Sequence, residues 1–123
     1  MAYAKNQMGL GVAAAEASGD FIAQVATGLT AAGTTQGTAL LVTADANLVS
    51  TVGASSGVII YNGVIGDSCI VFNDGGANAL TVYPPVGAKI NNLSTNSGMS
   101  LGINTSVLLA KVTATRWIGI LSA

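Results

Sequence analysis

The side chains of this sequence best suited to catalysis are two carboxylates and a thiol. Asp67 and Asp74 flank a short apolar segment, and Cys69 lies within that segment. Paired carboxylates hydrolyse glycosidic bonds when they lie within about 10 Å of each other. If residues 68–73 form a strand, its rise of about 3.3 Å per residue places the two carboxylates roughly 20 Å apart. We therefore interpret both as turn residues; a calcium ion held by either one with loop carbonyls is a weaker alternative.

Other catalytic constellations lack an essential member. The chain contains no histidine, which excludes Ser-His-Asp and Cys-His arrangements. Cys69 has no cationic neighbour in sequence to activate it, so we interpret it as a small buried hydrophobic residue. The glycines of segment 9–11 lack the preceding strand and third glycine of a phosphate-binding loop. We expect a protein that is not an enzyme and that holds no metal or cofactor.

The composition points to a subunit of an assembly. Charged residues make up 7% of the 123 residues and hydrophobic residues 50%, whereas soluble domains average about 25% charged residues. A monomer with so few surface charges would have difficulty staying soluble. We therefore expect copies of the same chain or a larger assembly to cover much of the surface.

The few cations exclude two kinds of partner. The net charge is −1, and the four basic residues are scattered along the sequence, so we expect neither nucleic-acid binding nor a polybasic membrane anchor. The uncharged run 21–44 is long enough to span a bilayer, but threonine, glutamine and glycine interrupt it repeatedly, so we expect no membrane span.

The chain changes character near residue 37. We interpret residues 1–36 as an N-terminal arm, with a short helix predicted over 13–26 where alanine is frequent. The arm either packs on a surface outside its own domain or is a disordered tail. Residues 37–123 are interpreted as a β-domain, because short β-rich runs alternate there with segments rich in Gly, Asn, Asp and Ser. The predicted strands are 39–43, 46–49, 58–62, 68–73, 79–83, 88–91, 99–103, 107–113 and 116–121.

These runs predict an all-β fold, an antiparallel β-sandwich or barrel. Residues 73–78 are interpreted as a hairpin loop and residues 113–115 as a second one. Pro84 and Pro85 are expected to end the strand before them, because proline cannot donate to a strand ladder.

Several predicted strands are apolar on both faces, most clearly 68–73 and 107–113. A sheet with one face in water should alternate apolar and polar residues. Two apolar faces predict that one packs on the core of the domain and the other on a neighbouring subunit. The residues we expect at this oligomer interface are Val71, Val82, Val107 and Leu109.

A longer segment carries a resemblance to a known class of proteins. Residues 66–91, GDSCIVFNDGGANALTVYPPVGAKIN, resemble a pattern of tailed-bacteriophage structural proteins. In that pattern a strand after Gly-Asp leads through an Asn- and Gly-containing loop to a second strand that ends at prolines. Later matching pieces are Ser100-Leu101, Thr105-Ser106 and Trp117, so the resemblance covers roughly residues 37–121. It implies a small, trimeric, β-rich virion component, and it transfers no catalytic or binding residues.

The resemblance favours a homotrimeric capsid decoration, or cement, protein that binds the outer surface of the major capsid protein and stabilises the shell. Such a protein is made in the host cytoplasm and resides on the virion. Removing residues 1–30 should abolish capsid binding and leave the trimer intact if the arm is the attachment device. The arm residues expected to contact the capsid are Tyr3, Leu10, Phe21 and Ile22.

The alternative is a head-fibre or tail-fibre component that binds host glycans. That function predicts exposed aromatic rings, with Tyr61, Tyr83 and Trp117 in one groove. For Trp117 alone, a core-anchoring role is the commoner one for a tryptophan.

Overall fold

The regular secondary structure of the described residues is almost entirely β-strand. A computed structural model describes residues 24–122, which contain no α-helix and only one short 3-10 helix. The prediction of an all-β chain is confirmed for these residues, and the nine predicted strands match the observed ones to within a few residues at each end. The elements are β1 Val25–Thr30, η2 Gln36–Thr38, β2 Leu40–Val42, β3 Ala46–Thr51, β4 Gly57–Ile60, β5 Ser68–Asn73, β6 Leu80–Tyr83, β7 Lys89–Ile90, β8 Met99–Leu101, β9 Ser106–Thr113 and β10 Arg116–Leu121.

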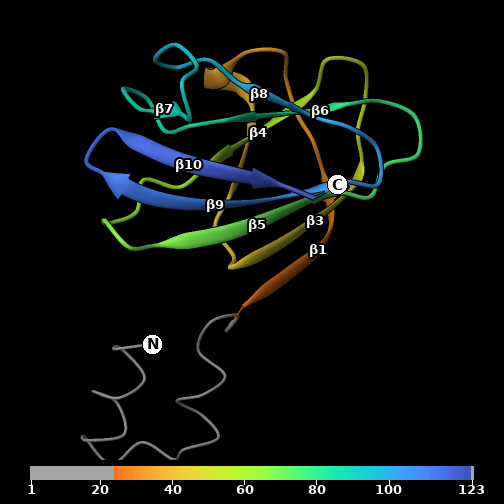
Figure 1. Ribbon diagram of the computed structural model, residues 1–123. Helices are drawn as coiled ribbons and strands as arrows, with labels where there is room; N and C mark the ends of the chain where they lie inside the picture. The colour runs from red at the N-terminus through yellow and green to blue at the C-terminus, as the bar shows by residue number, and fades with distance from the viewer. Residues whose placement is uncertain (1–23, 123) are drawn as a thin grey trace, which may run out of the picture.

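Two sheets make up the fold (Figure 1). The six-stranded sheet has the order β1-β3-β5-β9-β10-β7, and the four-stranded sheet has the order β2-β4-β6-β8. Side chains from both sheets belong to one hydrophobic core. In residues 24–122 no helix is long and apolar enough to cross a membrane.

The first six strands wind in a manner similar to the coils of a β-solenoid. Successive strands alternate between the two sheets, and each pairs in parallel with the strand two positions earlier. The prediction of antiparallel pairing is therefore wrong for this half of the fold. Parallel neighbours need a crossover connection, and here a strand of the opposite sheet supplies it where many proteins use a helix.

This winding also corrects one predicted hairpin. The loop 73–78 joins β5 of the six-stranded sheet to β6 of the four-stranded sheet, so it connects the sheets and does not fold one strand back on its neighbour. The second predicted hairpin is confirmed, because β9 and β10 pair in antiparallel fashion around residues 114–115. The prolines also end β6 at Tyr83 as predicted.

The β-domain begins earlier than the sequence predicted. β1 pairs with β3 from Val25 to Thr30, and Ala31 belongs to the buried core. Residues 25–36 are therefore part of the fold and not of an arm. The predicted helix over 13–26 lies outside the described residues, apart from its last positions, where β1 begins.

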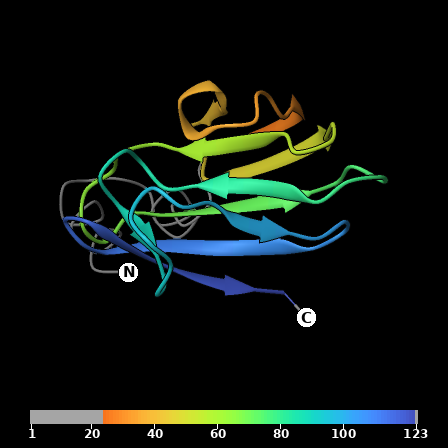
Figure 2. The same cartoon turned by 90° about the horizontal axis from the view of Figure 1, so that it is seen from above.

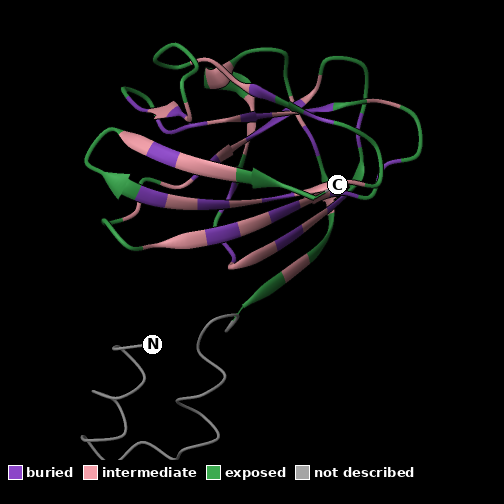
Figure 3. Cartoon of the chain, viewed as in Figure 1, coloured by how far each residue is buried: buried purple, intermediate pink, exposed green. Residues whose placement is uncertain are grey.

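Alternation along the central strands separates an inner from an outer face (Figure 3). In β5, buried Cys69, Val71 and Asn73 alternate with half-buried neighbours. β3 and β9 follow the same alternation. The inner residues pack between the sheets, and the fully buried Trp117 of β10 is the largest of them.

Two fully buried asparagines complete the backbone hydrogen bonding where the chain passes between the sheets. Asn47 Nδ2 donates to the carbonyls of Ala44 (2.9 Å) and Ile70 (3.1 Å). Asn73 Nδ2 donates to the carbonyls of Asn78 and Leu101, both at 3.0 Å. Each amide thus bonds backbone carbonyls from inside the fold, where water would otherwise have to do so.

The strand directions place the connecting loops at two ends of the molecule (Figure 2). The segments after β2, β4, β6 and β9 lie at one end, which we call the loop end: residues 43–45, 61–67, 84–88 and 114–115. The segments after β3, β5 and β8, residues 52–56, 74–79 and 102–105, lie at the opposite end.

Candidate assembly surfaces

The residues predicted to form the oligomer interface lie inside the single chain. Val71, Val82, Val107 and Leu109 have no exposed surface and belong to the hydrophobic core. Their side chains are therefore covered by the facing sheet of the same chain and have no surface to offer another copy. The two apolar faces exist as the sequence indicated, but these four residues are on the inner one.

The opposite face of the six-stranded sheet is apolar, and no other strand in residues 24–122 covers it. It is formed by the alternate residues of β3, β5, β9 and β10, and we call it the apolar outer face. A continuous row crosses it, because Ile70 pairs with Leu108 and Leu108 with Ile120. Its large and small apolar members, half-buried or exposed, are Leu48, Ile70, Phe72, Leu108, Ala110, Ile118 and Ile120.

The outer face of the four-stranded sheet is more polar. Its outward residues include Thr81, Tyr83 and Ser100 beside Leu41 and Ile59. The apolar outer face therefore has the stronger reason to be covered, because burying apolar area contributes about 25 cal/mol per Å².

Lys111 is a charged residue on the buried face of β9. It lies on the inner face at the end of the core and is only 7% exposed. Its Nζ donates to the carbonyl of Gly63 (2.6 Å) and to Asn62 Oδ1 (3.3 Å). The charged amine thus satisfies its hydrogen bonds at the loop end while its aliphatic part lines the core.

The loop 61–67 is held rigidly by further hydrogen bonds. Asp67 Oδ2 accepts from the Val64 amide (2.9 Å), and the Asp67 amide donates to the Val64 carbonyl (3.0 Å). The Gly66 amide donates to the Lys111 carbonyl (2.9 Å). A side chain at Gly63 would collide with Asp67, and Gly66 has a φ of +99°, so both glycines are required for this turn.

The tips of the loop end present large apolar side chains to solvent. Val64 is 70% exposed, Ile65 63% and Val86 78%. Sequence reasoning missed these residues, although an apolar pair between two glycines, Gly-Val-Ile-Gly, was a visible signal.

Charges are concentrated at the same end. Among residues 24–122 the sequence has six charged residues, and only Asp74 lies at the opposite end. Arg116 Nη2 donates to Asn92 Oδ1 (2.9 Å), and Asp45 Oδ2 accepts from the Gln24 amide (3.0 Å). The other five charged residues lie in the loop-end segments or in the strands beside them: Asp45, Asp67, Lys89, Lys111 and Arg116.

The carboxylates and the thiol do not meet as a catalytic group. Asp67 and Asp74 flank β5 at its two ends, as predicted. Cys69 is buried, and burial, with smaller contributions from the charges of Asp45 and Asp67, raises the pKa of its thiol to about 12. The thiol is therefore protonated at neutral pH, in agreement with its interpretation as a small hydrophobic residue. Over the described range, no three His, Cys, Asp or Glu side chains gather as a metal site.

The predicted aromatic groove is not formed. Trp117 is fully buried and meets Tyr61 edge to face, with ring centroids 6.1 Å apart. Burial first, and the charge of Asp67 second, raise the pKa of Tyr61 to about 12. Tyr83 lies on the outer side of the four-stranded sheet, where its hydroxyl donates to the Thr34 carbonyl (3.2 Å). Trp117 cannot stack on a sugar from this position.

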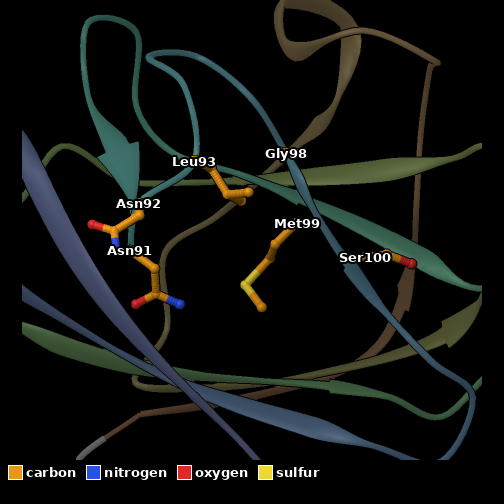
Figure 4. A pocket seen from close by; sticks show the side chains of 6 residues that line it. All are labelled: Asn91, Asn92, Leu93, Gly98, Met99 and Ser100. Atoms are coloured by element: carbon orange, nitrogen blue, oxygen red, sulfur yellow. The ribbon is translucent and has the colours of Figure 1, made fainter.

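An open hollow of about 490 Å³ lies beside the edges of both sheets (Figure 4). Leu93 and Met99 line it together with Asn91, Asn92, Gly98 and Ser100. The Asn91 side chain exchanges two hydrogen bonds with the Gly119 backbone, at 2.9 and 3.3 Å. Asn92 accepts from Arg116, so both amides have structural partners, and no acidic or basic side chain lines the hollow.

The residues predicted to contact a capsid, Tyr3, Leu10, Phe21 and Ile22, lie outside the described residues. Comparisons with protein-family models, curated proteins and solved structures find no match for this chain.

Proposed function

We propose that this chain is a non-enzymatic virion structural protein: a capsid decoration, or cement, protein that binds the outer capsid surface as a homotrimeric β-sandwich and stabilises the shell. The observation that carries the proposal is the apolar outer face of the six-stranded sheet, which is uncharged and which no other strand of residues 24–122 covers. A soluble protein rarely exposes such a face unless another protein covers it. The resemblance of residues 66–91 to tailed-phage structural proteins supports a virion as the assembly to which the chain belongs.

The subunit contact is the more direct consequence. The row Ile70–Leu108–Ile120 is flat, apolar and continuous over three strands. Packing it against the same face of other copies would remove that surface from water without burying an unpaired charge. The trimeric number comes from the resemblance, since any closed oligomer would cover the face.

The first test of the proposal is the native mass in solution. We expect light scattering over a dilution series to give three times the 12.1 kDa chain mass. Leu108→Lys and the more exposed Ile120→Lys should shift the protein towards monomer, because each places a charge in the covered face. The control Ser100→Lys, on the outer face of the other sheet, should leave the mass unchanged.

A stable, well-folded monomer of the wild-type chain would overturn the subunit contact. Circular dichroism of each variant separates loss of assembly from loss of fold. Co-sedimentation with capsids assembled without this protein then tests decoration itself, and failure of the wild-type chain to bind would contradict that part of the proposal.

A further inference from the structure

The loop end presents apolar side chains at the tips of hydrogen-bonded loops. Val64 and Ile65 are the tip of a loop whose backbone is held by Asp67 and Lys111. Exposed apolar residues on a loop that is already ordered bind a partner with little further loss of conformational entropy. Burial of these side chains against a partner would also remove apolar area from water.

A second apolar tip lies at the same end. Val86, the most exposed large hydrophobic residue described, follows Pro84 and Pro85 at the end of β6. β4 and β6 are parallel neighbours, so the loops that follow them emerge side by side (Figure 2). The two tips therefore face the same direction, away from the strand ends.

The described part of the chain begins at this end as well. The Gln24 carbonyl accepts from the Ala46 amide (3.1 Å), and the Gln24 amide donates to Asp45 in the loop end. The 23 residues that precede Gln24 would span about 75 Å if fully extended. A partner seated on the loop end lies within their reach.

We infer that the loop end is the surface that docks on the shell, with Val64, Ile65 and Val86 inserted into apolar depressions of the shell protein. This inference rests on the proposed function and adds the orientation of the molecule to it. The loop end lies at the ends of the strands and the apolar outer face along their sides. A copy packed on the outer face therefore leaves the tips free for the shell, and both surfaces work at once.

The test compares a double and a single apolar-to-polar variant of the full chain. The double variant Val64→Ser/Ile65→Ser removes the loop tip, and the control Ile103→Ser removes an exposed apolar residue, 45% exposed, at the opposite end. Both sites are exposed, so circular dichroism and light scattering should show unchanged fold and mass. Binding to capsids assembled without this protein is measured by co-sedimentation over a concentration series.

We expect the double variant to bind at least tenfold more weakly and the Ile103 control to bind within twofold of wild type. Equal binding by the double variant, or equal weakening by both variants, would overturn the docking orientation while the proposed function stands. Absence of binding by the wild-type chain would overturn the proposed function and the orientation with it. A photo-crosslinking group at position 65 should in addition couple to the shell protein, and the same group at position 103 should not.

Discussion

At the scale of single residues, Asn73 is a polar side chain in the core with every polar atom paired. It is fully buried at the end of β5. Nδ2 bonds two carbonyls, and Oδ1 accepts from the Gly75 amide (3.0 Å). Asn73 therefore joins the loop 73–78 to β8 and holds the crossing from one sheet to the other.

Asn73→Ala should lower the free energy of unfolding by about 3 kcal/mol, because it removes three hydrogen bonds to backbone groups, two of them buried. Urea denaturation followed by circular dichroism measures the change. Asn92→Ala is the matched control, since its side chain is exposed and bonds only the Arg116 side chain, and it should change stability by less than about 0.5 kcal/mol. A loss below 1 kcal/mol at Asn73 would mean that water replaces the amide.

Residue types indicated the burial of Cys69 and Trp117 but not which face of β9 is inside. Period-two alternation identifies two faces, and both faces of β9 are apolar. Lys111 is normally a marker of the solvent side. Here its amine reaches carbonyls of a loop 48 residues away in sequence, which nothing local in the sequence could indicate.

At the scale of elements, β1 is the strand that the sequence did not reveal. Its residues include Gly28, which has a φ of +66° and coincides with a shift of register between Ala26 and Leu29. Glycine and alanine are poor strand formers, so β1 depends on its pairing with β3. Local composition predicted the other strands well, because they are rich in branched residues bounded by turn residues.

A truncation that tests the N-terminal arm must therefore end before Gln24. Removing residues 1–23 should leave the unfolding temperature within a few degrees of wild type, because β1 and its pairing are retained. Removing residues 1–30 should cost about 2 kcal/mol or more, because it deletes an edge strand, the packing of Leu29 and the cover of β3. Thermal unfolding by circular dichroism measures both. Equal stability of the two truncated chains would show that β1 contributes nothing to the fold.

Sheet pairing was the part of the fold least accessible to sequence reasoning. Strand positions follow from composition and turn residues, but a partner 20 or more residues away leaves no local trace. The antiparallel end, β9 with β10, was predictable because only two residues separate the strands. The parallel pairings follow only from the three-dimensional course of the chain, which alternates between the two sheets.

At the scale of the whole molecule, the charged residues lie apart from the apolar outer face. In the stretch 24–122, five of the six charged residues lie at the loop end, while the apolar outer face is composed of uncharged residues. Association through that face should therefore depend on removal of apolar area from water and very little on ion pairs.

Raising NaCl from 50 mM to 1 M should change the dissociation constant of the oligomer by less than about threefold, because salt screens only interactions between charges. Sedimentation equilibrium measures the constant. Ammonium sulfate at equal ionic strength should tighten the oligomer, since sulfate strengthens apolar burial. A tenfold weakening in NaCl would instead place charged groups in the interface.

The parallel winding of β1 to β6 repeats one structural unit, a strand in each sheet. The paired strands are offset by 21 residues between Val25 and Ala46 and by 24 residues between Ala46 and Ile70. Each turn of chain adds one strand to each sheet and touches mainly the turns beside it, as in repeat proteins. Duplication of one such unit would extend both sheets by one strand without disturbing the antiparallel strands that close the other side of the fold.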